Sequence, residues 1–329
     1  MIPSTDAPAI RGRSRRRRRT TILWSVSGVI LAAAVIVLVV SISGSGSRSG
    51  TLANSCDIGP LAHCSDTDLT NKDLTNANLT EANLINAQLT GANLTNADLS
   101  GADLTSAVLT GADLTNANLA NAFLPYIVSG RIIGVPRVLP AGWTLVNGYL
   151  IGPWANLTGA DLTGADLTNT NLANTNLTAA ILTRTTLTGV DLTNANLTDV
   201  ISGGLIDSPN VLPTGWAIVN GYLIGHWANL TGADLTGADL AGADLTNTTL
   251  INAVLANAKL GGVNLTGADL TGADLTGADL TGANLTNATL AGAKFAAANL
   301  TDVVSSGLVD APASLPDGWS IVDGTITAP

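Results

Sequence analysis

The hydrophobic positions of this chain recur every five residues over most of its length. A leucine fills every fifth position over residues 69–124, 157–197 and 230–300, with Phe295 in place of one leucine. A period of five matches neither the 3.6-residue repeat of an α-helix nor the two-residue alternation of a simple strand. Such a short fixed period is typical of a solenoid, in which each repeat packs only on its neighbours.

Each unit has the same order of residue types, as in A-D-L-T-G at residues 233–237. The alanine and the leucine are two positions apart, so on an extended segment both side chains point inward. The aspartate or asparagine between them points outward, and so does the threonine after the leucine. The final glycine or asparagine tolerates the backbone conformations that turn a corner. The unit therefore predicts one short extended segment and one corner every five residues.

This pattern, A-(D/N)-L-x-x, resembles the pentapeptide repeat family. The resemblance implies an all-β fold, a right-handed quadrilateral β-helix with one repeat on each of four faces. Residues 20 positions apart would then stack about 4.8 Å apart on neighbouring coils.

The charges along the chain test this four-sided coil. Residues 20 apart are never both aspartate, as in Asp239, Lys259 and Asp279. A three-unit coil would instead stack Asp98 on Asp113, and like charges at that spacing repel. The sequence therefore favours four units in each coil.

The N-terminal segment has the features of a membrane anchor. Seven arginines lie between Arg11 and Arg19, and an uncharged run follows from Ile22 to Ile42. The run is long enough to cross a bilayer, and the arginines predict a cytoplasmic N-terminus. We expect a basic cytoplasmic tail over 1–20 and a transmembrane α-helix over 21–43. This places the chain in a bacterial plasma membrane as a single-pass protein with an extracytoplasmic repeat domain.

Other interpretations of this segment exist. The run is longer than a usual signal-peptide core, and V-V-S-I-S-G is a poor cleavage site, so we prefer an uncleaved signal-anchor to a cleaved signal peptide. Arg18 and Arg19 also faintly resemble a twin-arginine export signal. Nucleic-acid binding by the arginines is the weaker alternative, because a charge cluster beside an apolar run usually sets topology.

A glycine- and serine-rich segment over 44–55 is expected to be a flexible linker. Cys56 and Cys64 follow it, and an even cysteine count in an exported segment predicts a disulfide. We expect residues 56–66 to form an N-terminal cap on the solenoid, which covers residues 67–329. A metal site of His63, Cys56 and Cys64 is the alternative, but the spacing does not suit zinc.

Two related inserts, near 125–156 and 198–229, interrupt the repeats, and a truncated third copy lies within a C-terminal cap over 301–329. From Leu124 to Leu157 is 33 residues, which equals five units plus eight extra residues. We therefore expect each insert to be one degenerate coil that carries a proline-rich loop. Hairpins closed by the N-G pairs at 147–148 and 220–221 are the alternative. Counting four faces for each insert puts the first and third inserts on the same edge and the second one corner round.

Five tryptophans mark the three inserts, and exposed aromatic side chains can bind glycan or protein partners. The simpler interpretation is that they pin the inserts onto the coils. The five residues are Trp143, Trp154, Trp216, Trp227 and Trp319.

Composition argues against catalysis. From Gly44 onward there are 23 acidic and 7 basic residues, since Asp6 and seven arginines precede it, which gives a net charge of −16. His226 takes the place that Pro153 has in the first insert, so nothing indicates a catalytic histidine. The glycines recur at corners rather than in a phosphate-binding loop. The lack of stacked aspartates argues against a calcium site. We expect no enzyme activity, catalytic residue, cofactor or metal.

Three functions fit a non-catalytic solenoid. We favour a membrane-tethered extracytoplasmic scaffold or interaction module that binds an unidentified protein or envelope partner, with nucleic acid not expected as a ligand. The family resemblance implies an alternative, an acidic rod that mimics DNA and binds DNA gyrase, but this requires the repeats to be inside the cell. A third function is surface binding by the flat rows of outward threonines.

Overall fold

The computed structural model describes residues 52–53 and 56–329. Its named elements are short strands: β1 (Leu52–Ala53), β2 (Cys56–Asp57), β3 (Thr144–Val146), β4 (Tyr149–Ile151), β5 (Ala217–Val219), β6 (Tyr222–Ile224), β7 (Ser320–Val322) and β8 (Thr325–Thr327). The expected basic tail and transmembrane helix lie outside the described residues. The same holds for the expected linker apart from Leu52 and Ala53. No helix in the described part of the chain is both long and apolar enough to cross a membrane.

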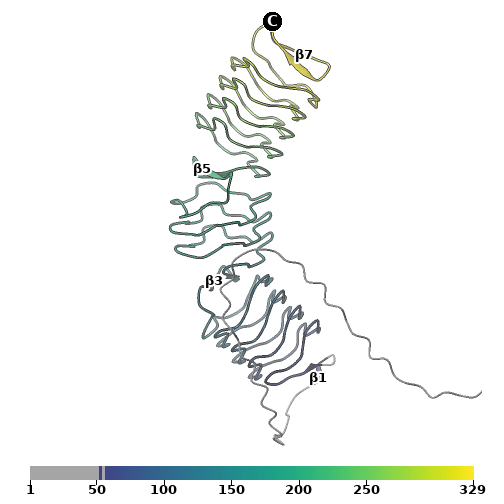
Figure 1. Cartoon of the computed structure of the whole chain (residues 1–329), viewed down its shortest axis with the longest axis vertical. Helices are drawn as coiled ribbons and strands as arrows, with labels where there is room; N and C mark the ends of the chain where they lie inside the picture. Colours follow the sequence, from purple (N-terminus) through teal and green to yellow (C-terminus); the bar gives the residue numbers. More distant parts are fainter. Residues whose placement is uncertain (1–51, 54–55) are drawn as a thin grey trace, which may run out of the picture. The chain divides into compact units, whose positions relative to one another are not determined.

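The repeats form stacked coils of four units each (Figure 1). Outward residues pair in parallel with residues 20 positions later: Asp73 pairs with Asn93, and Asn93 with Asp113. Backbone hydrogen bonds flank each pair: Leu74 N donates to Asn93 O at 2.8 Å, and Asn93 N donates to Lys72 O at 2.9 Å. The four-unit coil inferred from the charges is therefore confirmed. The chain belongs to the β-helix class of solenoids, in which each coil supplies the hydrogen-bond partners of the next.

Each corner is a four-residue turn that begins at the leucine. Ala82 N donates to Leu79 O at 3.0 Å, and Glu81, the third residue of the turn, has a φ of 54°. A positive φ at the third residue of such a turn is the signature of a type II turn, which favours glycine or asparagine. This requirement explains why most units end in one of these two residues.

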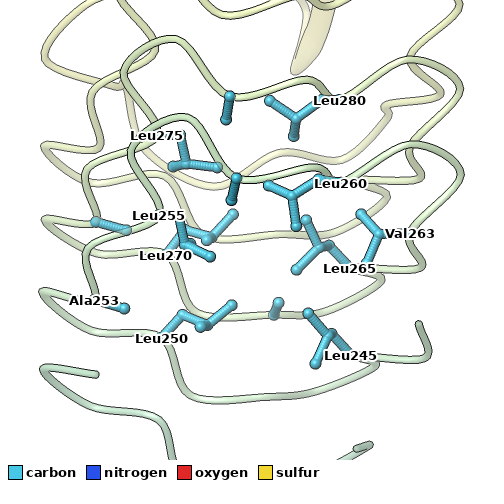
Figure 2. Close-up of a cluster of buried hydrophobic side chains, with 14 of the residues drawn as sticks. Leu245, Leu250, Ala253, Leu255, Leu260, Val263, Leu265, Leu270, Leu275 and Leu280 are labelled. Carbon is cyan, nitrogen blue, oxygen red and sulfur yellow. The ribbon is translucent and has the colours of Figure 1, made fainter. Parts of the chain in front are cut away.

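The core consists of the inward leucines and alanines, stacked coil above coil. Figure 2 shows Leu280 above Leu260 and Leu265 above Leu245 in the third repeat block. These leucines are fully or almost fully buried, and each contributes roughly 1.5–3 kcal/mol of hydrophobic stabilisation. The buried side chains fall into three clusters, one for each repeat block.

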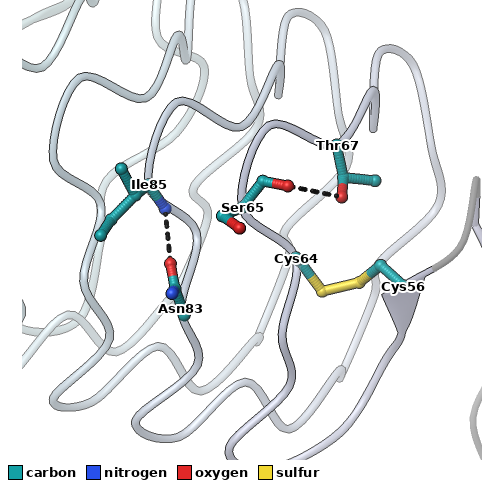
Figure 3. Close-up of a disulfide and its surroundings, with 6 residues drawn as sticks. All are labelled: Cys56, Cys64, Ser65, Thr67, Asn83 and Ile85. Carbon is teal, nitrogen blue, oxygen red and sulfur yellow. Dashed lines mark hydrogen bonds between the residues drawn. A yellow bond between two sulfur atoms is a disulfide. The ribbon is translucent and has the colours of Figure 1, made fainter. Parts of the chain in front are cut away.

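The N-terminal end of the repeats is covered by the disulfide between Cys56 and Cys64 (Figure 3). Both cysteines are fully buried, and their Cα atoms are 5.0 Å apart. They belong to the same core cluster as Leu69 and the following leucines. The disulfide predicted from the sequence is therefore present.

The inserts differ from the preferred expectation of a loop-bearing coil, because each contains a hairpin. β3 pairs with β4, β5 with β6, and β7 with β8, all antiparallel. The regular corner is lost in the proline-rich segments: Pro136 stands 20 residues after Asn116, a corner with a φ of 56°. Proline cannot take a positive φ, so the regular turn cannot form there. The ladder continues only as far as Val138, which pairs with Asn118, and the hairpin follows.

The hairpins nevertheless keep the four-face count. Across the first insert, Val128 pairs with Asn156, 28 residues later, so the insert adds eight residues to one coil. Ile201 pairs with Asn229 in the same way across the second insert. Following the parallel ladders unit by unit puts β3–β4 and β7–β8 on the same face and β5–β6 on the next face. This order agrees with the count made from the sequence.

Candidate interaction surface

The outward faces of the regular units are built from internally bonded polar side chains. In most units the Asp or Asn side chain accepts a hydrogen bond from the backbone two residues later, and often from that residue's hydroxyl. Thr75 N and Oγ1 donate to Asp73 Oδ1 at 3.1 and 2.6 Å. The threonine hydroxyl therefore points back onto its own unit. The threonine hydroxyls donate within their own units, so they are less available to bind an external surface. This weakens the hypothesis that the rows of outward threonines bind a surface.

These bonds also lower the pKa of several of the carboxylates, among them Asp113 and Asp98. The side chain of Thr115, and then its backbone N–H, hold the pKa of Asp113 below its ordinary value. Ser100 lowers the pKa of Asp98 in the same way, and Asn118 adds a further bond from the next coil. The repeated aspartates thus act as ionised acceptors that fix the turns, and a general acid or base needs the opposite, a pKa raised toward neutrality.

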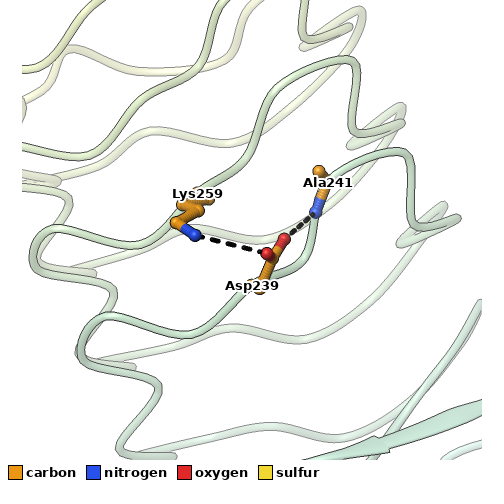
Figure 4. A network of polar contacts seen from close by, with 3 residues as sticks. All are labelled: Asp239, Ala241 and Lys259. Atoms are coloured by element: carbon orange, nitrogen blue, oxygen red, sulfur yellow. Dashed lines mark hydrogen bonds and ion pairs between the residues drawn. The ribbon is translucent and has the colours of Figure 1, made fainter.

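Between coils, several aspartates contact an asparagine or a lysine of the neighbouring coil. Lys259 Nζ lies 3.5 Å from Asp239 Oδ2, one coil away, and Asp239 also accepts from Ala241 N (Figure 4). Both side chains are largely exposed, so the ion pair adds little stability. Its importance is that it avoids a stack of two carboxylates.

The structure divides the five tryptophans into two groups. Trp143, Trp216 and Trp319 are half-buried and pack against the core clusters beside their hairpins. They pin the inserts, as the simpler interpretation of the sequence has it. Trp154 and Trp227 are exposed instead.

An exposed aromatic pair lies at the corner beside the first insert. Trp154 is 43% exposed and Tyr126 is 50% exposed, and their rings meet edge to face with centroids 5.7 Å apart. Both have a positive φ, 64° and 59°, which is costly for bulky residues. The two corners are linked by Tyr126 N, which donates to Trp154 O at 2.7 Å. Phe123, three residues before Tyr126, is also exposed.

Apolar side chains also replace the outward Asp or Asn on the coils that lead into each hairpin. All of them are valine or isoleucine except Phe123. They are exposed, at positions where the regular units carry a polar side chain. The residues are Phe123, Ile133 and Val138 before the first hairpin, Ile201, Ile206 and Val211 before the second, and Val304 and Val309 before the third. The described surface thus becomes apolar around the inserts.

A polar pocket lies at the base of the first insert. It has a volume of about 380 Å³ and is lined by Asn96, Ala97, Asp98, Asn116, Asn118 and Arg137. Arg137 contributes to the lowered pKa of Asp98 by its positive charge. The second and third inserts have Asn210 and Ala313 in the place of Arg137, so this combination belongs to the first insert alone.

The sites considered from the sequence have clear outcomes. Both cysteine thiols are used in the disulfide, so the alternative metal site with His63 is wrong. No group of three or more metal-binding side chains occurs among the described residues. His226 lies beside Trp216, with ring centroids 5.7 Å apart.

The exposed apolar surface of Phe123, Tyr126 and the outward aliphatic residues was not predicted from the sequence. The signal was present, because these positions depart from the repeat consensus: an aromatic residue fills a corner normally held by Gly or Asn. Such departures from the repeat consensus indicate candidate functional positions, because the consensus residues are sufficient to form the coil.

Among solved structures, the chain is similar to HetL from the cyanobacterium Nostoc sp. strain PCC 7120, a pentapeptide repeat protein involved in the regulation of heterocyst differentiation. The identity is 30% over 74% of this chain and 85% of HetL, with a TM-score of 0.26. Rfr23 from the cyanobacterium Cyanothece 51142 is 25% identical, covers 48% of this chain and 91% of its own, and has a TM-score of 0.20. QnrB1, a plasmid-mediated fluoroquinolone resistance protein, is 16% identical, with coverages of 73% and 89% and a TM-score of 0.25.

A comparison with functionally curated proteins finds no match. The family model for pentapeptide repeats matches in eight copies, over residues 61–96, 92–124, 160–199, 228–267 and 264–302. These matches cover the three blocks of leucine-centred units and leave out the inserts. The coil geometry, the repeat pattern and the family match agree, and the chain belongs to the pentapeptide repeat family.

Proposed function

We propose that this protein is a non-catalytic interaction module, tethered to the plasma membrane, whose repeat domain binds an envelope protein outside the cytoplasm. The observation that carries the binding proposal is the change of surface at the first insert. Regular coils present polar side chains that are bonded within their own units, whereas Tyr126, Trp154 and Phe123 present exposed aromatic surface there. Exposed aromatic residues next to polar neighbours are the usual anchors of protein interfaces.

The conformation of the pair supports this assignment. Asparagine is the commonest residue at corners without a glycine, and it tolerates a positive φ better than an aromatic residue does. Tyr126 and Trp154 are therefore locally unfavourable choices for the fold, and backbone strain of this kind is often retained where a side chain has a function.

The binding experiment uses the double variant Tyr126→Asn and Trp154→Asn in the full chain. Asparagine suits both corners, so the variant should fold and remain at least as stable as the wild-type protein. Capture of envelope proteins after crosslinking in cells, followed by mass spectrometry, should lose a specific partner in the variant. Asn96→Gly, a change at a regular corner, is the matched control and should retain that partner. Equal capture by all three proteins would remove the aromatic corner from the function.

The location is tested separately, because it depends on residues 1–43. The arginine cluster and the uncharged run after it support an anchor with the repeats outside. Protease added to intact cells should then remove the repeat domain and leave a small membrane-bound fragment. Repeats that stay protected until the membrane is broken would contradict this topology and favour a cytoplasmic partner such as gyrase.

A further inference from the structure

The three hairpins share one lower face, which packs on the repeat block before them. In the third copy, Ile326 joins the core cluster of the third block, with Trp319 and Ile321 packed against it. Leu150 and Leu223 take the place of Ile326 in the first and second copies, and each belongs to the cluster of the preceding block. A buried serine hydroxyl accepts the N–H of this central residue at 2.9 Å in all three copies: Ser129, Ser202 and Ser305.

The first two hairpins also have an apolar upper face, which packs on the block that follows. Ile151 is fully buried in the core cluster of the second block, and Val146 and Tyr149 pack against that cluster. Alternate residues of a strand point to opposite faces, so one hairpin serves two cores. In the second hairpin the equivalent residues pack on the third block: Ile224, Val219 and Tyr222.

Two hydrogen bonds join this upper face to the next block. Asp161 N donates to Tyr149 Oη at 3.2 Å, and the buried Thr175 hydroxyl donates to Gly152 O at 3.3 Å. The second insert repeats both bonds at 3.2 Å, from Asp234 to Tyr222 and from Thr248 to Gly225. Thr175 and Thr248 stand at inward positions that are usually alanine, and in these two coils the buried hydroxyl bonds to the end of the hairpin in the coil before it.

The third hairpin keeps the lower face and changes the upper one. Thr325 replaces the tyrosine, and Thr327 replaces the buried isoleucine. The Thr327 hydroxyl lies 2.7 Å from the Ser320 hydroxyl across the hairpin, and Val322 is 54% exposed. The face that would meet another coil is therefore mostly polar and is hydrogen-bonded to itself.

Two glycines that allow close packing in the inner copies are also changed. An added Cβ at Gly130 would lie 3.0 Å from Tyr149 Cε1, and one at Gly152 would overlap the Trp143 ring. The third copy has Ser306 and Ala328 at these positions. The serine occurs only where the tyrosine is absent, so the two sites change together.

We infer that the inner hairpins are docking surfaces for a repeat coil and that β7–β8 is the same module altered so that it rejects a further coil or the end of a second copy. Three exchanges carry the difference: Tyr to Thr325, Ile to Thr327 and Gly to Ser306. A polar outer face is what keeps the last unit of a solenoid from associating. The hairpin thus acts as a joint in two places and as a cap in the third.

The test extends the full chain so that the third hairpin is followed by a block that normally docks on a hairpin. Residues 152–329 are appended after Thr327, which supplies a first coil with Thr175 and a natural last hairpin. One protein keeps Ser306, Thr325 and Thr327, and the other carries Ser306→Gly, Thr325→Tyr and Thr327→Ile. Covalent attachment supplies a high local concentration, so docking does not depend on a large interface.

Both proteins are digested with a broad-specificity protease in the same detergent, and cleavage at the junction is followed by mass. We expect the restored protein to be cleaved about tenfold more slowly, because cleavage follows the open population when opening is fast. Equal protection of both proteins would show that the threonine face docks a coil and would overturn the inference, and equally rapid cleavage of both would also overturn it.

The same three changes in the unextended chain of residues 1–329 provide a second measurement. Exposure of the restored apolar face should increase the binding of a hydrophobic dye, and light scattering should show an increase in mass with concentration relative to the wild type. Val322→Thr, which makes the face more polar, is the control and should change neither quantity. A wild-type chain that associates, and loses this association with Val322→Thr, would contradict the cap.

Discussion

At the scale of single residues, glycine has two separate roles in this protein. At regular corners such as Gly111, with a φ of 70°, it provides a backbone conformation that side chains rarely adopt, and an added Cβ would meet nothing within 4 Å. At Gly152 and Gly225 the need is space, because the rings of Trp143 and Trp216 lie directly on the backbone. The first role appears in the sequence as a period of five, and the second appears only when the inserts are compared.

The need for space at Gly152, beside the Trp143 ring, predicts the effect of Gly152→Ala. The new methyl group would overlap the Trp143 ring, so the hairpin must shift and the protein should lose about 1–3 kcal/mol of unfolding free energy. Gly59→Ala is the matched control: its φ is ordinary, an added Cβ meets nothing within 4 Å, and we expect a change within about 0.5 kcal/mol. Urea denaturation, monitored by tryptophan fluorescence, measures the unfolding free energy of both variants. Equal losses in the two variants would show that Gly152 is not required for close packing against Trp143.

The aspartates predict how stability depends on pH. The pKa values of Asp73, Asp98, Asp113 and Asp274 are lowered in the folded protein by hydrogen bonds from the following threonine or serine. The unfolded chain therefore binds these protons at a higher pH than the folded one. The stabilisation is complete above the unfolded pKa, near 4, and is lost as the pH falls through the lower folded values.

Replacing these four residues with asparagine tests the argument. Asparagine at the same unit position accepts the same bond: Thr80 N and Oγ1 donate to Asn78 Oδ1 at 3.2 and 2.7 Å. The variant should therefore match the wild type at pH 7 and lose less stability between pH 5 and about pH 2. Melting curves at 0.15 M salt, where mutual repulsion of the surface charges is screened, provide the measurement. An unchanged acid slope would show that other groups control it.

At the scale of elements, the sequence predicts the regular coils. For the inserts it predicts the number of faces that each one occupies, but not that each one contains a hairpin. The four-unit coil follows from the charges at 20-residue spacing, and the cap follows from the position of Cys56 and Cys64. The 33-residue spacing fits both a loop-bearing coil and a hairpin, so arithmetic alone does not separate them. The residue types do: L-V within T-L-V, and Y-L-I, carry apolar or aromatic side chains at consecutive positions, which indicates strands buried on both faces. A unit of a coil has only one inward face.

The buried serines predict a difference between inner and terminal hairpins. Ser129→Ala leaves the N–H of Leu150 without its acceptor between two packed blocks, which should cost about 1–3 kcal/mol. Ser305→Ala removes the same bond to Ile326, but the last hairpin is covered on one side only, so water reaches the N–H when it loosens. We expect a smaller loss there. Hydrogen exchange at the two amides is the direct measurement, and equal losses would contradict a one-sided terminal hairpin.

At the scale of the whole molecule, the hairpins make the repeat blocks exchangeable. From Asn147 to Asn220 is 73 residues, and the three side-chain hydrogen bonds that join the first hairpin to its neighbouring blocks recur in the second at that distance. These bonds include Ser129 with Leu150 and Ser202 with Leu223. A solenoid is stabilised by contacts between neighbours, so a whole block can be removed if both cut points fall at equivalent places.

Deletion of residues 148–220 should therefore give a shorter folded protein. The new hairpin joins the strand that ends at Val146 to β6 through Asn147 and Gly221, which preserves the N-G turn and the alternation of faces. The third block then docks on Tyr222 and Ile224 as before. We expect one cooperative thermal transition and the β-type circular dichroism of the parent. Deletion of residues 148–221 removes one residue more, the register slips by one, and every side chain of the second strand turns to the opposite face. That control should unfold at a lower temperature or in two steps, and equal stability of the two deletions would show that the hairpins are not joints.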